Sequence, residues 1–225
     1  APYGDKNKDE IFSRSEKIAN YLLKNHEIDA LVIACNTATS VAIKHLREVF
    51  PSLIIIGTEP GIKPAINNTK TRNIGILATS STLKGEKYQL LANELTTKSE
   101  VKLYEQACIG LVEQIENGEI NSLKTYSMLE TWLKPMLHNK VDTIVLGCTH
   151  YPLVKKTILD IVGEDVLLID TGDAIAKRVV TLSQDLQNNN KDELNIEILY
   201  TGKINSDMVK IILGKNKFEM RKCEL

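Results

Sequence analysis

Short apolar segments alternate with amphipathic ones along this chain. The apolar segments are rich in β-branched residues, and most end at Gly, Thr, Asp or Cys, as strands of a parallel sheet often do before a helix. They lie at residues 30–34, 53–56, 74–78, 143–146, 166–169 and 196–200. Between them apolar residues recur at helical spacing, as in residues 11–23. This alternation predicts an α/β fold with mainly parallel strands and helices on both faces.

Local signals place some of the connecting segments. A hydroxyl-rich stretch at residues 79–82 precedes a helical stretch at 83–95, and Pro152 fits the first turn of a helix that begins after His150. The polar residues 184–193 predict a surface loop.

Composition is that of an ordinary globular protein, with 225 residues, 43% of them hydrophobic and 25% charged. The formal net charge is −1 without a basic block, so we expect no nucleic-acid partner. No apolar run approaches the roughly 18 residues of a membrane span, and the first residues lack the basic head and apolar core of a signal peptide. The four cysteines form no CxxC pair. We expect a cytoplasmic protein with reduced thiols and no membrane partner.

One signature occurs twice, at residues 31–37 (LVIACNT) and 144–150 (IVLGCTH). Each has an apolar run, a small residue, a cysteine and then side chains that can hydrogen-bond. Ligands of open α/β sheets bind beyond the carboxyl ends of strands, and a helix N-terminus there favours a thiolate. A single such cysteine is more simply a small buried hydrophobe. The duplication favours two opposed thiols, Cys35 and Cys148, that remove a proton from one face of a carbon and replace it on the other.

The polar neighbours of these cysteines have two interpretations. Asn36, Thr37 and Thr149 can cap helices or bind a carboxylate. His150 can orient or protonate its surroundings, or pack in a turn. The hydroxyls at residues 79–82 can hold an anion or serve as an ordinary N-cap. The chain has neither a GxGxxG nor a GxxxxGK[ST] motif, so nothing supports a nucleotide cradle.

Four sequence pieces carry a resemblance to a known family. They are PYG at residues 2–4, ACNTA at 34–38, GCTHYPL at 147–153 and DTGDA at 170–174. In these pieces, and in their order along nearly the whole chain, the sequence resembles the glutamate racemases of the aspartate/glutamate racemase superfamily. The resemblance implies interconversion of L- and D-glutamate without a cofactor or metal, which supplies D-glutamate for bacterial peptidoglycan. It also suggests a homodimer.

Carried over by position, the resemblance assigns roles to individual residues. Cys35 and Cys148 match the two acid/base thiols. His150 and Glu116 match catalytic positions near the second thiol, although Glu113 lies one helical turn from Glu116. The remaining matches are to substrate contacts: Tyr3, Gly4, Asn36, Thr37, Thr149, again His150, and Thr82.

The resemblance also implies two pseudo-symmetric subdomains, each a mainly parallel sheet flanked by helices, with the active site in the cleft between them. We expect residues 1–68 plus 172–225 to form the first and residues 69–171 to form the second. Family members carry a strand ending in Asp-Ser-Gly upstream of the PYG motif, and that Asp is the expected partner of the Cys35 thiol. This chain has no such segment, so we expect it to be a fragment.

Two other functions remain open from the sequence. One is a related racemase that acts on aspartate, a hydantoin or a malonate derivative. The other is a catalytically inactive homologue that binds an amino acid in the same cleft.

Overall fold

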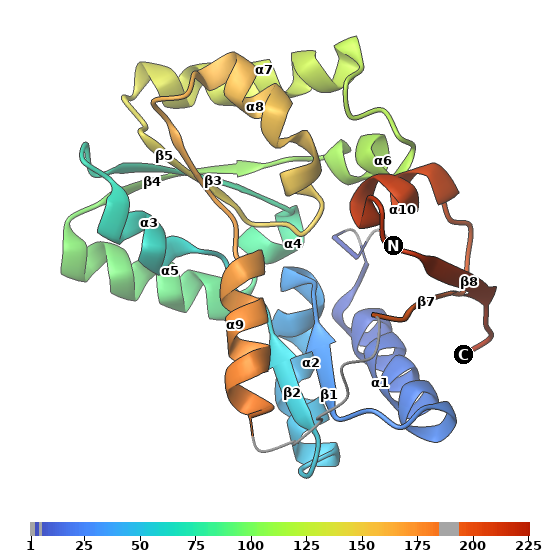
Figure 1. The fold of residues 1–225 in the computed structure, drawn as a ribbon. Coiled ribbons are helices and arrows are strands. Elements are labelled where there is room, and N and C mark those ends of the chain that lie inside the picture. Colours follow the sequence, from blue (N-terminus) through green and yellow to red (C-terminus); the bar gives the residue numbers. More distant parts are fainter. Residues whose placement is uncertain (1–2, 5, 185–193) are drawn as a thin grey trace.

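The computed structural model describes residues 3–4, 6–184 and 194–225. Helices and strands alternate along the chain, as the hydrophobic pattern predicts (Figure 1). Apart from Gln184, the predicted loop at 184–193 lies outside the described residues, as does Pro2 of the PYG motif. None of the described helices is long and apolar enough to span a bilayer.

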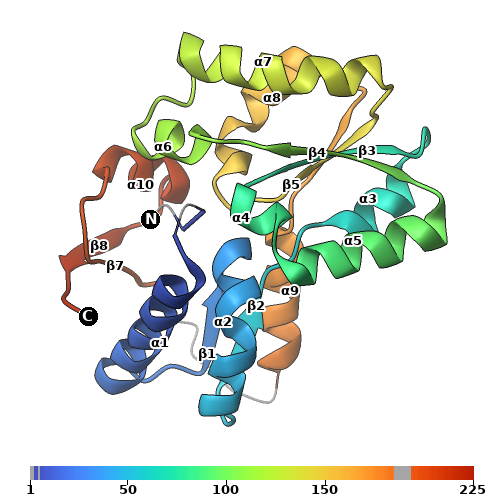
Figure 2. The ribbon, with the colours of Figure 1, turned by 180° about the vertical axis from the view of Figure 1, so that it is seen from behind.

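The larger sheet has four parallel strands in the order β4-β3-β5-β6. The strands are β3 (Asn73–Ala78), β4 (Lys102–Ala107), β5 (Thr143–Leu146) and β6 (Leu167–Ile169). Helices cover both faces of this sheet (Figures 1 and 2). They are α3 (Ile62–Asn68) and α5 (Glu86–Ser99) on the first face, and α6 (Leu111–Glu116), α7 (Leu123–His138) and α8 (Lys155–Val162) on the second.

Side chains of this sheet alternate between two buried clusters. Ile76 and Val145 pack with α3 and α5, whereas Leu77, Ile144 and Leu146 pack with α6, α7 and α8. Successive strand residues point to opposite faces, so a nearly continuous apolar run fills both layers. The sheet is therefore covered on both faces, in agreement with the α/β prediction.

A smaller sheet pairs β1 (Ala30–Ile33) with β2 (Ile54–Gly57) in parallel. Helix α2 (Asn36–Val49) packs on one face and α9 (Gly172–Leu182) lies on the other (Figures 1 and 2). Helix α1 (Lys8–Asn25) packs against α2. The C-terminal part adds β7 (Ile196–Tyr200), α10 (Ser206–Leu213) and β8 (Phe218–Lys222), in which β7 and β8 pair in parallel.

The structure adds detail to the sequence predictions, and departs from them, at four elements. Strands β4 and β8 were not predicted, because their sequences KLYEQA and FEMRK contain charged residues and few apolar ones. The predicted helix at 83–95 is divided into α4 (Ser80–Leu83) and α5, since the chain turns at Lys84 and Gly85, and Gly85 is the N-cap of α5. The helical segment after His150 starts with a 3₁₀ turn (Tyr151–Val154) that contains Pro152, and α8 follows it.

Candidate active site

Cys35 lies where β1 ends and α2 begins. It is the N-cap residue of α2, and its Sγ accepts a hydrogen bond from the backbone N–H of Ala38 at 3.5 Å. A sulfur at this position takes up one of the N–H groups that the first helical turn leaves free, and it lies in the positive end of the helix dipole. Cys35 is therefore held by the first turn of α2, with its sulfur at the end of the helix that carries free N–H groups.

Cys148 occupies the matching place at the end of β5. Its Sγ lies 3.7 Å from Nδ1 of His150, and Nε2 of the same ring lies 2.7 Å from Oε1 of Glu116 at the end of α6. Burial, opposed by a hydrogen bond from the backbone N–H of His150 and assisted by the nearby Cys35, raises the pKa of Cys148 to about 11. Cys148 is therefore a neutral thiol near pH 7 and can donate a proton.

Both thiols line one cavity of about 210 Å³. The other predicted contact residues that line it are Tyr3, Gly4, Asn36, Thr37, Thr82, Thr149 and His150. Glu113 also lines this cavity, whereas Glu116 lines a neighbouring groove and reaches the site through the His150 ring. The structure thus gathers around one space residues that are far apart in the sequence.

Asn36 ties the two cysteine-bearing segments together. Its Nδ2 donates a hydrogen bond to the carbonyl of Gly147 at 2.8 Å, directly before Cys148. Asn36 is buried, and this bond joins the first turn of α2 to the end of β5. The contact restrains the distance between the two thiols.

A cluster of hydroxyls forms one wall of the cavity. Thr37 Oγ1 lies 3.1 Å from Thr79 Oγ1 and 3.2 Å from Thr82 Oγ1, and the last two lie 3.0 Å apart. Ser81 Oγ donates to the carbonyl of Gly4, which holds the start of the chain against this wall. Such a wall can offer several hydrogen bonds to an oxyanion such as a carboxylate.

A third thiol, which no sequence motif indicates, lies at the cavity. Cys108 directly follows β4, is 3% exposed and lines the cavity together with Cys148. Burial raises its pKa to about 12, so it stays neutral. The fully buried Tyr151 lies beside it, and burial holds the pKa of its hydroxyl far above the usual range. Cys108 therefore forms a neutral floor of the cavity, with Tyr151 buried beside it, and the position of Cys108 after a strand is the signal that could have revealed it.

The described residues contain no cluster of three or more His, Cys, Asp or Glu side chains placed to hold a metal ion. The fold and the cavity define an α/β protein in which strands from two sheets bring two thiols to one space lined by hydrogen-bond donors.

Comparison with known proteins gives the family. The model of the Asp/Glu/Hydantoin racemase family matches residues 7–179. The chain is 62% identical to a glutamate racemase of Aliarcobacter butzleri over 225 residues, which cover 100% of this chain and 86% of the relative. It is 58% identical to a glutamate racemase of Sulfurovum sp. over 213 residues, covering 95% of this chain and 80% of the relative. The chain belongs to the Asp/Glu/Hydantoin racemase family.

Solved structures agree with this assignment. A glutamate racemase isoform from Bacillus anthracis superposes with a TM-score of 0.84 at 29% identity, over 100% of this chain and 84% of that one. Escherichia coli glutamate racemase, in complex with L-glutamate and the activator UDP-MurNAc-ala, gives a TM-score of 0.82 at 29% identity, over 98% and 83% of the two chains. The two-subdomain α/β fold expected from the sequence is that of these proteins.

Proposed function

We propose that this racemase interconverts L- and D-glutamate without a cofactor. One thiolate removes the α-proton, and the opposing thiol donates a proton to the other face of the α-carbon. The observation that carries the proposal is the shared cavity, because Cys35 and Cys148 line it from the ends of strands in different sheets. The curated relatives named above support glutamate as the substrate. The roles given to the residues that line the cavity belong to the same proposal.

The proton balance needs one thiolate and one thiol. The thiolate takes the α-proton, and the electron pair of the broken C–H bond stays on the α-carbon. The opposing thiol then gives its proton to the other face and becomes a thiolate, so the configuration is inverted with no net loss of protons. The raised pKa of Cys148 makes it the proton donor of the free protein. Cys35, at the N-terminus of α2, is then the base.

The charge that develops on the substrate needs preorganised donors, because an α-proton next to a carboxylate is only weakly acidic. The hydroxyls of Thr37, Thr79 and Thr82 and the N–H groups at the start of α2 supply such donors. On the other side, the ring of His150 lies between Cys148 and Glu116 and can orient the thiol or relay its proton.

Two substitutions test the mechanism in the full-length gene product. We expect Cys35→Ala and Cys148→Ala each to lower racemisation by at least about a hundredfold, since each removes an acid/base group. Cys223→Ala is the matched control, because this free cysteine does not line the cavity and should leave turnover unchanged. Polarimetry follows racemisation, and proton NMR in D₂O follows deuterium entry at the α-carbon. Near-native turnover in either active-site variant would refute the two-thiol mechanism.

The same assays separate the alternatives. Aspartate and a hydantoin are tested beside glutamate, and faster turnover of either would replace glutamate as the substrate. Calorimetry with glutamate identifies an inactive binding homologue if heat of binding is measured without α-proton exchange.

The cellular setting is also a proposal. We infer a cytoplasmic homodimer that supplies D-glutamate for peptidoglycan. The four free cysteines support a reducing compartment, and the family resemblance supports the dimer, which sedimentation velocity measures directly.

A further inference from the structure

The chain passes twice between the smaller and the larger sheet. The first passage follows β2 and leads to α3, which packs on β5 of the larger sheet. The second passage follows β6 and leads to α9, which packs on β2 of the smaller sheet. Any change in the relative position of the two sheets must act on these two segments.

One hydrogen bond joins the two passages. Thr58 is the first residue after β2, and Thr171 lies directly before α9. Their Oγ1 atoms lie 3.2 Å apart, although the residues are 113 positions apart in the sequence. Thr58 is 2% exposed, so water does not compete readily for this bond.

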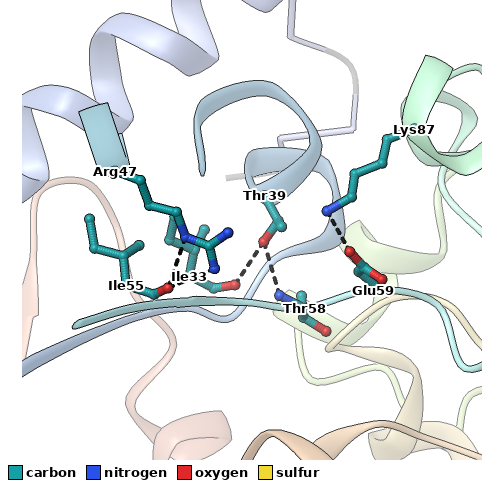
Figure 3. Close-up of polar contacts among 7 residues, drawn as sticks. All are labelled: Ile33, Thr39, Arg47, Ile55, Thr58, Glu59 and Lys87. Carbon is teal, nitrogen blue, oxygen red and sulfur yellow. Dashed lines mark hydrogen bonds and ion pairs between the residues drawn. The ribbon is translucent and has the colours of Figure 1, made fainter. Parts of the chain in front are cut away.

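A third threonine extends the connection to the helix that carries Cys35. Thr39, in the first turn of α2, is 1% exposed. Its Oγ1 donates to the carbonyl of Ile33 at 3.0 Å and accepts a hydrogen bond from the backbone N–H of Thr58 at 3.2 Å (Figure 3). Ile33 is the last residue of β1, so one hydroxyl joins the strand before Cys35, the helix after it and the first passage.

Helix α2 is held at its other end as well. Nε and Nη2 of Arg47 donate to the carbonyl of Ile55 at 3.2 and 2.8 Å (Figure 3). Gly57 lets the helix lie close, because a Cβ there would be 2.5 Å from Cγ2 of Thr39. Because α2 is held at both ends, a shift of the passages is transmitted to α2 as a whole. The ion pair between Lys87 and Glu59 also joins the first passage to α5, but it is about half exposed and contributes little to stability.

We propose that Thr39, Thr58 and Thr171 are positioning residues, which together form a hydroxyl bridge that sets Cys35 opposite Cys148. This inference rests on the proposed function. None of the three lines the main cavity, so they act through α2 and not on the substrate. A displacement of about 1 Å between reacting groups can reduce a rate about a hundredfold, so a small loss of order in the bridge has a measurable effect.

Substitutions of the Thr58–Thr171 pair test the bridge, because they remove one hydroxyl and leave the backbone bonds in place. We expect Thr58→Val and Thr171→Val each to lower kcat about tenfold with KM changed less than threefold. The double variant should be no slower than the slower single variant, because all three lose the same bond. Thr58→Ser and Thr171→Ser keep the hydroxyl and should retain kcat within twofold. The α-deuterium isotope effect on kcat should rise in the valine variants, since proton transfer becomes more rate-limiting.

Thr125→Val is the matched control. Thr125 is fully buried, and its hydroxyl donates to the carbonyl of Glu119 at 2.6 Å near the start of α7, where it does not line the cavity. This variant should lose stability and keep both kcat and the isotope effect. The inference is overturned if Thr58→Val keeps kcat within twofold, if the losses of the two single variants multiply in the double variant, or if Thr125→Val loses kcat equally.

A readout without turnover separates this inference from the proposed function. Dibromobimane joins two thiols only when they are close, so its rate of cross-linking Cys35 to Cys148 reports their relative position. We expect slower cross-linking in Thr58→Val than in Thr125→Val, in a Cys223→Ala background. If the unsubstituted protein fails to exchange the α-proton, the proposed function is wrong, and equal cross-linking rates would then refute the bridge independently.

Discussion

At the scale of single residues, the two thiols have similar places in the fold but different surroundings. Cys35 caps a helix, whereas Cys148 is buried deeply enough to raise its pKa to about 11 and has an imidazole beside it. The sequence motifs predicted that both thiols follow strands. They could not predict the surroundings of Cys148, because this thiol packs against a buried cluster, with members such as Cys108 and Tyr151, that forms only in the folded protein.

The carboxylate beside His150 leads to a prediction at this scale. Glu116→Gln keeps the shape of the side chain but removes the charge 2.7 Å from Nε2 of His150. We expect kcat to fall about tenfold or more, because the ring loses the hydrogen-bond partner that orients it. Glu113→Gln is the comparison variant, because Glu113 lies one helical turn earlier on α6 and itself lines the cavity. Polarimetric kcat values for both variants decide the assignment, and a larger loss in Glu113→Gln would transfer the role to that residue.

At the scale of elements, the strongly apolar strands were predictable and the charged ones were not. Strands β3 and β5 are buried on both faces, so their apolar runs are nearly continuous. Strand β4 lies at the edge of the larger sheet, where residues such as Lys102 and Glu105 are tolerated because one side faces solvent or a loop. A pattern built on apolar runs therefore misses an edge strand as charged as β4, whereas it finds the edge strand β6, whose residues are apolar.

Close packing at the end of β5 gives the prediction for this scale. A Cβ on Gly147 would lie 2.9 Å from the carbonyl oxygen of Leu77 and 3.1 Å from Cβ of Ala78, and the strand backbone of β3 cannot move aside easily. We expect Gly147→Ala to lower the free energy of unfolding by about 1–3 kcal/mol, and to displace the adjacent Cys148. Gly202→Ala is the control, because nothing lies within 4 Å of its Cβ position. Urea unfolding measures both, and equal midpoints would contradict the packing argument.

At the scale of the whole molecule, the site depends on contacts between distant parts of the chain. The sequence motifs identified most residues that line the cavity, since these residues follow strands and the ends of parallel strands meet at one edge. The bond between Thr58 and Thr171 has no such local signal, because both are ordinary threonines until the fold brings the two passages together. Sequence patterns therefore identify the groups that carry out the chemistry more readily than they identify the groups that position them.

The buried titratable groups lead to a prediction for the stability of the whole fold. Burial raises the pKa of Cys148 to about 11 and that of Cys108 to about 12, from 9.0 for an ordinary thiol. Burial also raises the pKa of the Tyr88 and Tyr151 hydroxyls above the usual range. Above pH 9 the unfolded chain therefore releases protons that the folded protein keeps. The stabilisation that these neutral groups give to the folded protein is fully present below pH 9 and is lost as the pH rises toward 12.

Urea unfolding at intervals from pH 8 to 11 measures this loss. Each thiol that stays neutral only in the folded protein adds up to about 1.4 kcal/mol per pH unit to the slope. Cys108→Ala should therefore make the dependence on pH shallower between pH 9 and 11. Leu129→Ala is the matched control from the same buried cluster, and it should lower stability by a similar amount at every pH. If the stability of Cys108→Ala and that of the unsubstituted protein fall with pH at the same slope, Cys108 does not stay neutral at the floor of the cavity. The neutral environment proposed for Cys148 is then wrong.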